Sequence, residues 1–187
     1  REIAPNIRLE LLYMLANVYI KENKINSALK IIDVLISVNP DYKDVTALKA
    51  KYTELASNKN LKIYLMSATS EFVNLCRKIA PVFFPGEHVK ITDITAAKSD
   101  YVDLVAEVTS DQAEDIALFR FIRSTAPVGD IMLRDLYFKS KDVRAGKSFC
   151  LTAGSFTETA EKFVEARTID LVGSKQLMSI LNKVSPG

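Results

Sequence analysis

The sequence has little of the residue types that form disulfides and zinc sites: its 187 residues include two cysteines and one histidine. Cys76 lies in a helical pattern and Cys150 in a strand pattern, both among apolar neighbours, which is typical of buried, reduced thiols. A disulfide between them stays open at this stage. Because the cysteines and His88 are scattered and lack ligand spacing, the sequence argues against a zinc site.

Long apolar segments are also missing. No run reaches the roughly 18 residues that a membrane-spanning helix needs, and no basic-then-apolar leader of the secretory kind is seen. The chain begins with Arg1 rather than methionine, which predicts a fragment of a longer protein. We therefore expect no membrane contact within this fragment and a cytoplasmic location.

The larger part of the chain, residues 61–187, has no excess of either basic or acidic residues. Residues 1–60 carry nine Lys/Arg and seven Asp/Glu, a net charge of +2, and residues 61–187 carry sixteen of each. Nucleic-acid-binding domains usually have a basic excess, because neutralising phosphates supplies most of their affinity. The neutral larger part thus favours protein partners over nucleic acid, although a local basic patch is compatible with this balance.

Two helical patterns open the chain. Apolar residues recur at helical spacing over residues 9–20, a polar break follows at 21–24, and a second pattern covers 28–36. The second helix ends at Pro40, because proline cannot continue a helix. Two helices joined by so short a connection pack antiparallel. Residues 43–57 predict a third helix, which either caps this pair or starts another one.

This hairpin resembles a tetratricopeptide unit over residues 9–42. Small residues at Ala16 and Ala28 let two helices approach closely, and large residues fill the space between them. The resemblance implies a concave surface for peptide or protein partners around Leu12 and Tyr19, or else a purely structural adaptor. The large residues and the terminal proline stand at the family's expected places: Leu12, Leu15, Tyr19, Ile32, Leu35 and Pro40.

The rest of the chain, residues 67–187, alternates helical and strand patterns. Strands that alternate with helices predict right-handed crossovers and a mixed sheet buried between helices. The predicted helix starts are Asp130, Ser174 and a capping box of Ser155 with Glu158. In chain order the elements are a helix at 70–80, strands at 88–94, 102–108 and 116–122, a helix at 130–144, a strand at 148–153, a helix at 157–166, a strand at 168–172 and a helix at 174–184.

Three stretches of this part carry a family pattern: the strand 101–106, the strand exit and helix entry 123–129, and the strand, small-residue turn and capped helix 151–160. With them, the chain over about residues 68–184 resembles the Mrr-like branch of the PD-(D/E)xK nuclease superfamily. The resemblance implies a restriction-endonuclease-like mixed sheet flanked by helices. The sequence as a whole therefore predicts an α+β or α/β protein of two modules: a helical repeat with its capping helix at 1–60 and an endonuclease-like domain at 67–187.

The same resemblance places the candidate catalytic residues. Phosphodiester cleavage in this superfamily uses carboxylates that hold Mg²⁺ and a lysine that orients water. Asp103 matches the family's aspartate, and Glu71 matches a helix glutamate often found near the site. The Glu/Gln-x-Lys pair, however, falls on Arg120 and Ile122. An arginine repels Mg²⁺ and an isoleucine offers no hydrogen bond, which predicts a non-catalytic remnant in which Asp103 pairs with Arg120.

An active site rebuilt from other residues is the alternative. Arg123 cannot replace the lysine, because it points to the opposite face of its strand from Arg120. Glu107 lies on the same strand face as Asp103, so these two carboxylates are the metal ligands in this hypothesis. Lys139 or Lys141, on the following helix, would then supply the migrated ammonium group.

Two surface features are further candidates. Phe83 and Phe84, between two prolines, are interpreted as a docking patch or as a loop folded over the core. A basic cluster near a helix end is interpreted as a phosphate-binding patch or as a solvated face that complements the helix dipole. Its members are Lys139, Lys141, Arg144 and Lys147.

The leading hypothesis is a non-catalytic scaffold that binds protein partners and needs no cofactor. It rests on the repeat-like hairpin, the neutral larger part and the missing lysine at the family's usual place. The alternative is a DNA-binding protein or a Mg²⁺-dependent endonuclease of the Mrr type with a migrated catalytic lysine. A continuous basic groove across Asp103 would favour the alternative, and mixed charge would favour the scaffold.

Overall fold

The structure is a computed structural model that describes residues 5–97 and 100–185. The chain divides into two compact units, Arg1–Lys62 and Ile63–Gly187, which are called the first and the second unit below. In the part of the chain that is described, no helix combines the length and the apolar character needed to cross a membrane.

The first unit is built from three helices: α1 (Pro5–Lys21), α2 (Ile25–Val38) and α3 (Val45–Ser57). The chain reverses between α1 and α2 through Asn23, whose φ of 59° is tolerated best by glycine, asparagine and aspartate. Ala16 and Ala28 are both fully buried, so the small side chains lie where the two helices of the hairpin pack together. A fourth helix, α4 (Lys59–Met66), spans the boundary between the units.

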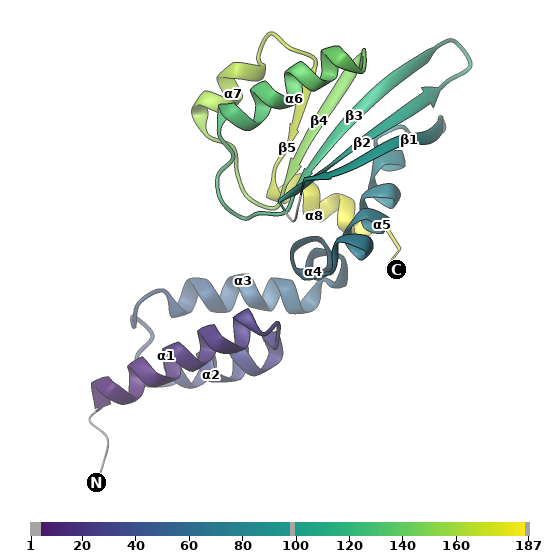
Figure 1. The fold of residues 1–187 in the computed structure, drawn as a ribbon. Coiled ribbons are helices and arrows are strands. Elements are labelled where there is room, and N and C mark those ends of the chain that lie inside the picture. Colours follow the sequence, from purple (N-terminus) through teal and green to yellow (C-terminus); the bar gives the residue numbers. More distant parts are fainter. Residues whose placement is uncertain (1–4, 98–99, 186–187) are drawn as a thin grey trace. The chain divides into compact units, whose positions relative to one another are not determined.

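The second unit is organised around a five-stranded sheet in the order β1-β2-β3-β4-β5 (Figure 1). The first three strands form an antiparallel meander, and β3, β4 and β5 run parallel to one another. Parallel neighbours require helical crossovers, which the helices before β4 and β5 supply. The strands are β1 (His88–Ala97), β2 (Tyr101–Thr109), β3 (Glu114–Ile122), β4 (Lys147–Thr152) and β5 (Ile169–Val172).

Helices cover both faces of this sheet. One face is covered by α6 (Asp130–Asp142) and α7 (Glu158–Val164), and the other by α5 (Thr69–Ile79) and α8 (Ser174–Lys183) (Figure 1). The predicted fold class, N-terminal helices followed by a mixed sheet between helices, is therefore confirmed. The side chains packed between the sheet and α6 and α7 include Val105, Leu118, Ile122, Leu133, Leu136, Cys150 and Phe163.

The helix starts differ in detail from the sequence-based prediction. The cap of α7 is Thr157, whose Oγ1 accepts a hydrogen bond from the backbone N–H of Ala160 at 3.2 Å, so the predicted capping box at Ser155 is wrong. Asp130 and Ser174 are the first residues inside their helices, because glycine precedes each of them as the cap. In all three cases the helix begins after a cap residue with extended backbone: Gly129, Thr157 and Gly173.

Candidate active site

The candidate site is built on a pair of directly opposed residues in the middle of the sheet. Asp103 of β2 and Arg120 of β3 are register partners in the antiparallel ladder. The guanidinium donates two parallel hydrogen bonds to the carboxylate, from Nε to Oδ1 and from Nη2 to Oδ2, both at 2.7 Å. Both side chains are almost fully removed from solvent, with exposed fractions of 3% for Asp103 and 1% for Arg120. This is the bidentate geometry that planar guanidinium and carboxylate groups favour.

Helix α6 holds the far side of the guanidinium. Arg120 Nη1 donates to the carbonyl oxygen of Met132 at 3.1 Å and contacts Asp135 Oδ2 at 2.7 Å. The ring of Tyr101 lies 4.2 Å from the Arg120 Cζ atom, which adds a cation–π contact. Arg120 is thus held from four directions and stands as a fixed cation between two carboxylates.

A second cation reaches the same aspartate from α6. Lys139 Nζ lies 3.1 Å from Asp103 Oδ2, and its side chain keeps 25% of its surface exposed. The three contact residues Met132, Asp135 and Lys139 are spaced by three and four positions, which is the spacing of one helix face. Of the two lysines proposed from the sequence, Lys139 therefore lies at the site, whereas the Nζ of Lys141 lies 5.0 Å from the ring centre of Tyr137.

The electrostatics of the pair follow from burial and pairing. Burial by itself lowers the pKa of Arg120, but the hydrogen bonds and charge of Asp103, helped by Asp135, raise that pKa overall above its usual value. Arg120 therefore stays charged at every physiological pH. A buried charge is tolerated only when it is paired and hydrogen-bonded. Asp103 and Arg120 therefore each need the other's charge to stay buried in the ionised form.

The remaining residues predicted for the catalytic centre lie elsewhere. Glu107 is four residues beyond Asp103 on β2, a separation of about 13 Å along a strand, and it pairs with Lys90 of β1 at 3.1 Å. Asp103 and Glu107 are thus too far apart to share one metal ion. Glu71 is exposed in the first turn of α5, on the opposite face of the sheet. Ile122 is buried in the apolar cluster under α6.

Arg123 lies on the other face of the sheet, as its position in the strand predicts. Its guanidinium donates to the carbonyl oxygens of Tyr64 and Ser67, at 2.9 and 2.6 Å, and lies 4.6 Å from the ring centre of Phe72. It therefore cannot supply the missing lysine charge next to Asp103.

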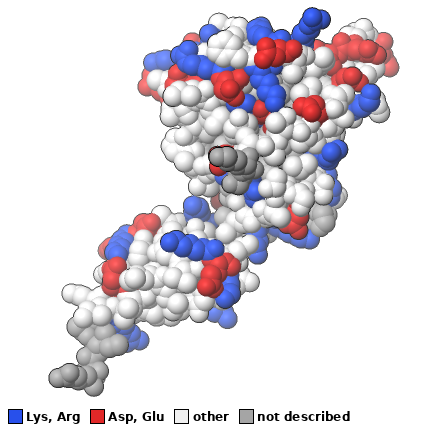
Figure 2. Space-filling view, in the orientation of Figure 1, with Lys and Arg blue, Asp and Glu red and all other residues white. Residues whose placement is uncertain are grey.

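The predicted basic cluster is divided by the structure. Lys139 turns inward to Asp103, while Lys147 pairs with Asp170 of β5 at 3.0 Å. Arg144 follows the end of α6, with a positive φ of 57°. Lys and Arg side chains are interspersed with Asp and Glu over the face of the second unit in Figure 2. The four residues thus do not act as one phosphate-binding patch.

The predicted docking residues are partly covered. Phe83 lies in the 3₁₀ turn after α5 (Ala80–Phe83), and its ring packs on those of Phe119 and Phe149, with centroids 5.5 and 4.7 Å apart. Phe84 contacts the same two rings edge-on. The segment is therefore a loop folded over the core, which was the alternative to a docking patch. Leu12 and Tyr19 of α1 are half-buried.

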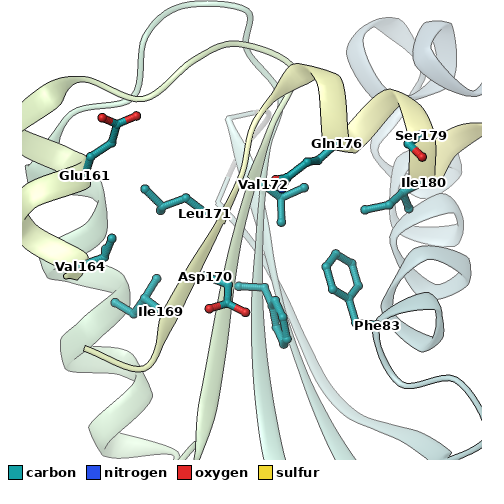
Figure 3. A pocket seen from close by; sticks show the side chains of 11 residues that line it. Phe83, Glu161, Val164, Ile169, Asp170, Leu171, Val172, Gln176, Ser179 and Ile180 are labelled. Carbon is teal, nitrogen blue, oxygen red and sulfur yellow. The ribbon is translucent and has the colours of Figure 1, made fainter. Parts of the chain in front are cut away.

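A cavity of about 580 Å³ lies at the β5 edge of the sheet, between α7 and α8 (Figure 3). Phe83, Val172 and Ile180 give it an apolar wall, and Glu161 and Asp170 place carboxylates at its margin. Anionic groups repel phosphate. This cavity is therefore a poor candidate for a nucleic-acid site, in contrast to the two cations next to Asp103.

Comparison with known proteins identifies the family. The model of the Mrr catalytic domain, described as a restriction endonuclease, matches residues 71–181, which is more than half of the chain. The chain belongs to the Mrr restriction endonuclease family. The match contains both strands of the Asp103–Arg120 pair and the whole of α6.

Two solved restriction endonucleases are similar to this chain. One is the DNA modification-dependent restriction endonuclease AspBHI, with a TM-score of 0.46 and 10% identity over 66% of this chain and 34% of that chain. The other is the MspJI restriction endonuclease in complex with a 27-mer oligonucleotide, with a TM-score of 0.45 and 17% identity over 73% of this chain and 30% of that chain. This chain spans about a third of the length of these enzymes. No curated protein matches it.

Membership of this family overturns the leading sequence-based hypothesis. The prediction of a non-catalytic scaffold with protein partners is wrong, because the matched family consists of restriction endonucleases. The neutral balance over residues 61–187 does not exclude a local basic site, since a total over many residues hides the two cations that α6 and β3 bring to Asp103.

The family usually depends on Mg²⁺, but the side chains around Asp103 do not fit that ion in the arrangement described. Both Asp103 oxygens already accept hydrogen bonds from Arg120, and Lys139 contacts one of them as well. Among the described residues, no group of three or more His, Cys, Asp or Glu side chains is placed to hold a metal ion. Mg²⁺ requires several oxygen ligands in nearly octahedral geometry.

Sequence reasoning missed Asp135 and Met132 as members of this site. Their signal was the spacing to Lys139, which places all three on the same helix face once Lys139 is directed at Asp103. Nothing in the sequence alone indicates that Arg120 would bind the helix as well as the neighbouring strand.

Proposed function

We propose that the second unit acts on DNA as a nuclease of the Mrr type, with Asp103 and Lys139 as the residues that carry the site. The reaction class is hydrolysis of a phosphodiester: water adds to phosphorus, and the bond to one ester oxygen breaks. The observation that carries the proposal is the 3.1 Å contact between Lys139 Nζ and Asp103 Oδ2. It restores a carboxylate–lysine pair in a family whose chemistry uses one.

Lys139 is suited to contact a phosphate because it is the more accessible of the two cations at the site. A quarter of its side chain is exposed, whereas Asp103 and Arg120 are buried. An ammonium on a flexible stem can stay close to its carboxylate and still donate a hydrogen bond to a phosphate oxygen. The pairing with Asp103 holds that ammonium near the reacting group, which is the role the family assigns to its lysine.

A hollow lies near the pair, lined by Met132 and by residues of the segment between β3 and α6, with Asp100 and Arg123 at its margin. Its volume is about 420 Å³, and its lining includes Ile122 at the end of β3 together with Gly129 and Met132 at the start of α6. Met132 is the residue whose carbonyl oxygen holds Arg120. Met132 therefore both lines the hollow and contacts Arg120. This supports binding of a DNA backbone at this end of the sheet.

The test is a matched pair of lysine variants. Lys139→Met and Lys141→Met remove the same charge from the same helix, but only the first lysine contacts Asp103. Binding of a labelled duplex and cleavage of a plasmid are measured together at low salt, with Mg²⁺ and with EDTA. Loss of cleavage in Lys139→Met and its retention in Lys141→Met support the proposal. Equal behaviour of the two variants, or no action of the wild type on DNA, refutes it.

The first unit is proposed to be a tetratricopeptide-like hairpin. The complete burial of Ala16 and Ala28 supports this, because repeat units of that kind need small residues where their two helices cross. Replacing Ala28 with leucine should separate the helices and lower the helical circular dichroism of the first unit at moderate temperature. An unchanged melting curve would contradict the proposal.

A further inference from the structure

We infer that the guanidinium of Arg120 takes the place of a divalent cation, so that the second unit acts on DNA without a metal ion bound at Asp103. The part of this inference that concerns DNA rests on the proposed function. The exclusion of divalent ions from Asp103 does not depend on it and is measured separately.

The first support is geometric. Arg120 lies between two carboxylates, Asp103 at 2.7 Å and Asp135 at 2.7 Å, from two different elements of the fold. Bridging carboxylates is what a metal ion does in a two-ligand site. Here the bridge is covalently part of the chain, and its orientation is locked further by the Met132 carbonyl and the Tyr101 ring.

The second support is the balance of charge. Arg120 and Lys139 bring two positive charges, and Asp103 and Asp135 bring two negative charges, so the cluster is neutral as it stands. A divalent ion added beside Arg120 would create an uncompensated double charge where the guanidinium and Asp103 are desolvated. A phosphodiester adds only a single negative charge, and it can do so at the exposed part of Lys139 instead of at the buried pair.

The third support is the penalty for displacing Arg120. A metal ion that binds Asp103 through both oxygens must compete with both guanidinium hydrogen bonds. Because Arg120 is 1% exposed, breaking them without movement of α6 leaves a buried cation that has lost its buried carboxylate and keeps only the exposed Asp135 as an ion-pair partner. Removing one member of a buried pair, with Asp135 compensating in part, is unfavourable enough to weaken metal binding on the order of a hundred-fold.

The experiment is a Mn²⁺ titration followed by electron paramagnetic resonance, with Mn²⁺ as the probe for a Mg²⁺-type site. The wild type is expected to show no saturable site at millimolar Mn²⁺. Arg120→Gln, which frees both carboxylates, is expected to gain one site, and Arg120→Gln with Asp103→Asn to lose it again. Arg134→Gln is the matched control, because Arg134 is an exposed arginine of α6 that pairs with Asp130 and not with Asp103.

A wild-type site that disappears in Asp103→Asn overturns the inference, and this measurement does not depend on whether Arg120→Gln folds. On DNA, wild-type binding and cleavage are expected to be equal within two-fold in Mg²⁺ and in EDTA. Cleavage that EDTA abolishes also overturns the inference. If the wild type neither binds nor cleaves DNA, the proposed function fails while the Mn²⁺ titration still decides the question of metal exclusion.

Discussion

Replacing Asp103 with asparagine tests whether the buried ion pair is the centre of the second unit. Asparagine keeps the shape of the side chain, but it removes the charge that balances Arg120 and the second acceptor of its bidentate pair. Arg120 is then a cation with 1% of its surface exposed whose remaining carboxylate partner is the exposed Asp135.

The magnitude follows from measurements on buried pairs in general. Leaving one partner buried and unpaired costs about 3–5 kcal/mol. Asp135 recovers part of this, because it contacts the same guanidinium from α6, so the lower end of that range, about 3 kcal/mol, is expected for Asp103→Asn. For a unit of this size that corresponds to a fall in melting temperature of roughly 10 °C.

The assay is urea and thermal unfolding followed by circular dichroism, with a double variant as the partner experiment. Asp103→Leu combined with Arg120→Met removes both charges and fills the space with apolar atoms. It should be within about 1–2 kcal/mol of the wild type, because apolar replacement of a whole buried pair is often neutral. A loss below about 1 kcal/mol in Asp103→Asn would refute the reasoning, as would a double variant that is less stable than the single one.

Three further predictions concern the lysine, a glycine turn and a buried thiol. Lys139→Met should lose plasmid cleavage while Lys141→Met keeps it, as measured by gel electrophoresis of supercoiled substrate. Gly154→Ala should lower the free energy of unfolding in urea by about 1–3 kcal/mol, since a Cβ there would lie 2.6 Å from a backbone oxygen. The control Gly129→Ala should change stability little, because a Cβ there would meet nothing within 4 Å. Equal effects of the two substitutions would contradict this prediction. Burial raises the pKa of Cys150 to about 12. The unfolded thiol therefore ionises first, and the free energy of unfolding should fall as the pH rises from about 9 towards 12, less steeply in Cys150→Ala.

The order of the elements in the second unit was predictable because each leaves a local signal. The alternating pattern of β1, the apolar runs of β2 and β3 and the continuous apolar run of β4 identify the strands. The breaks around Pro127 and Gly154 separate them from the following helices. The capping residue of α7 was misassigned, because Ser155 and Thr157 both offer a hydroxyl oxygen and only the backbone conformation selects between them.

The candidate site was only partly predictable. The register of β2 against β3 could be anticipated from the family resemblance, and it brings Asp103 opposite Arg120. The rotation of α6 about its axis could not, because both Lys139 and Lys141 follow the same polar pattern in the sequence. Packing of Leu133 and Leu136 against the sheet sets that rotation and directs Lys139 rather than Lys141 at the pair.

Function was misjudged for a related reason. A balance of sixteen basic and sixteen acidic residues in the larger part of the chain suggested that nucleic acid was not the partner. Affinity for a phosphate depends on the few cations that face it, however, and not on a sum over the surface. The tetratricopeptide-like character of the first unit stays a prediction.

The most direct test of the central claim is one titration of labelled duplex DNA with wild type, Asp103→Asn and Lys139→Met, read by fluorescence anisotropy with cleavage followed in the same tubes. The account predicts that the wild type binds more tightly than the non-specific range of about 10⁻⁴–10⁻⁶ M and cuts the duplex, and that both variants lose cleavage. Wild-type protein that leaves the duplex uncut, or variants that cut it as fast as the wild type, would contradict the assignment of Asp103 and Lys139 as the site.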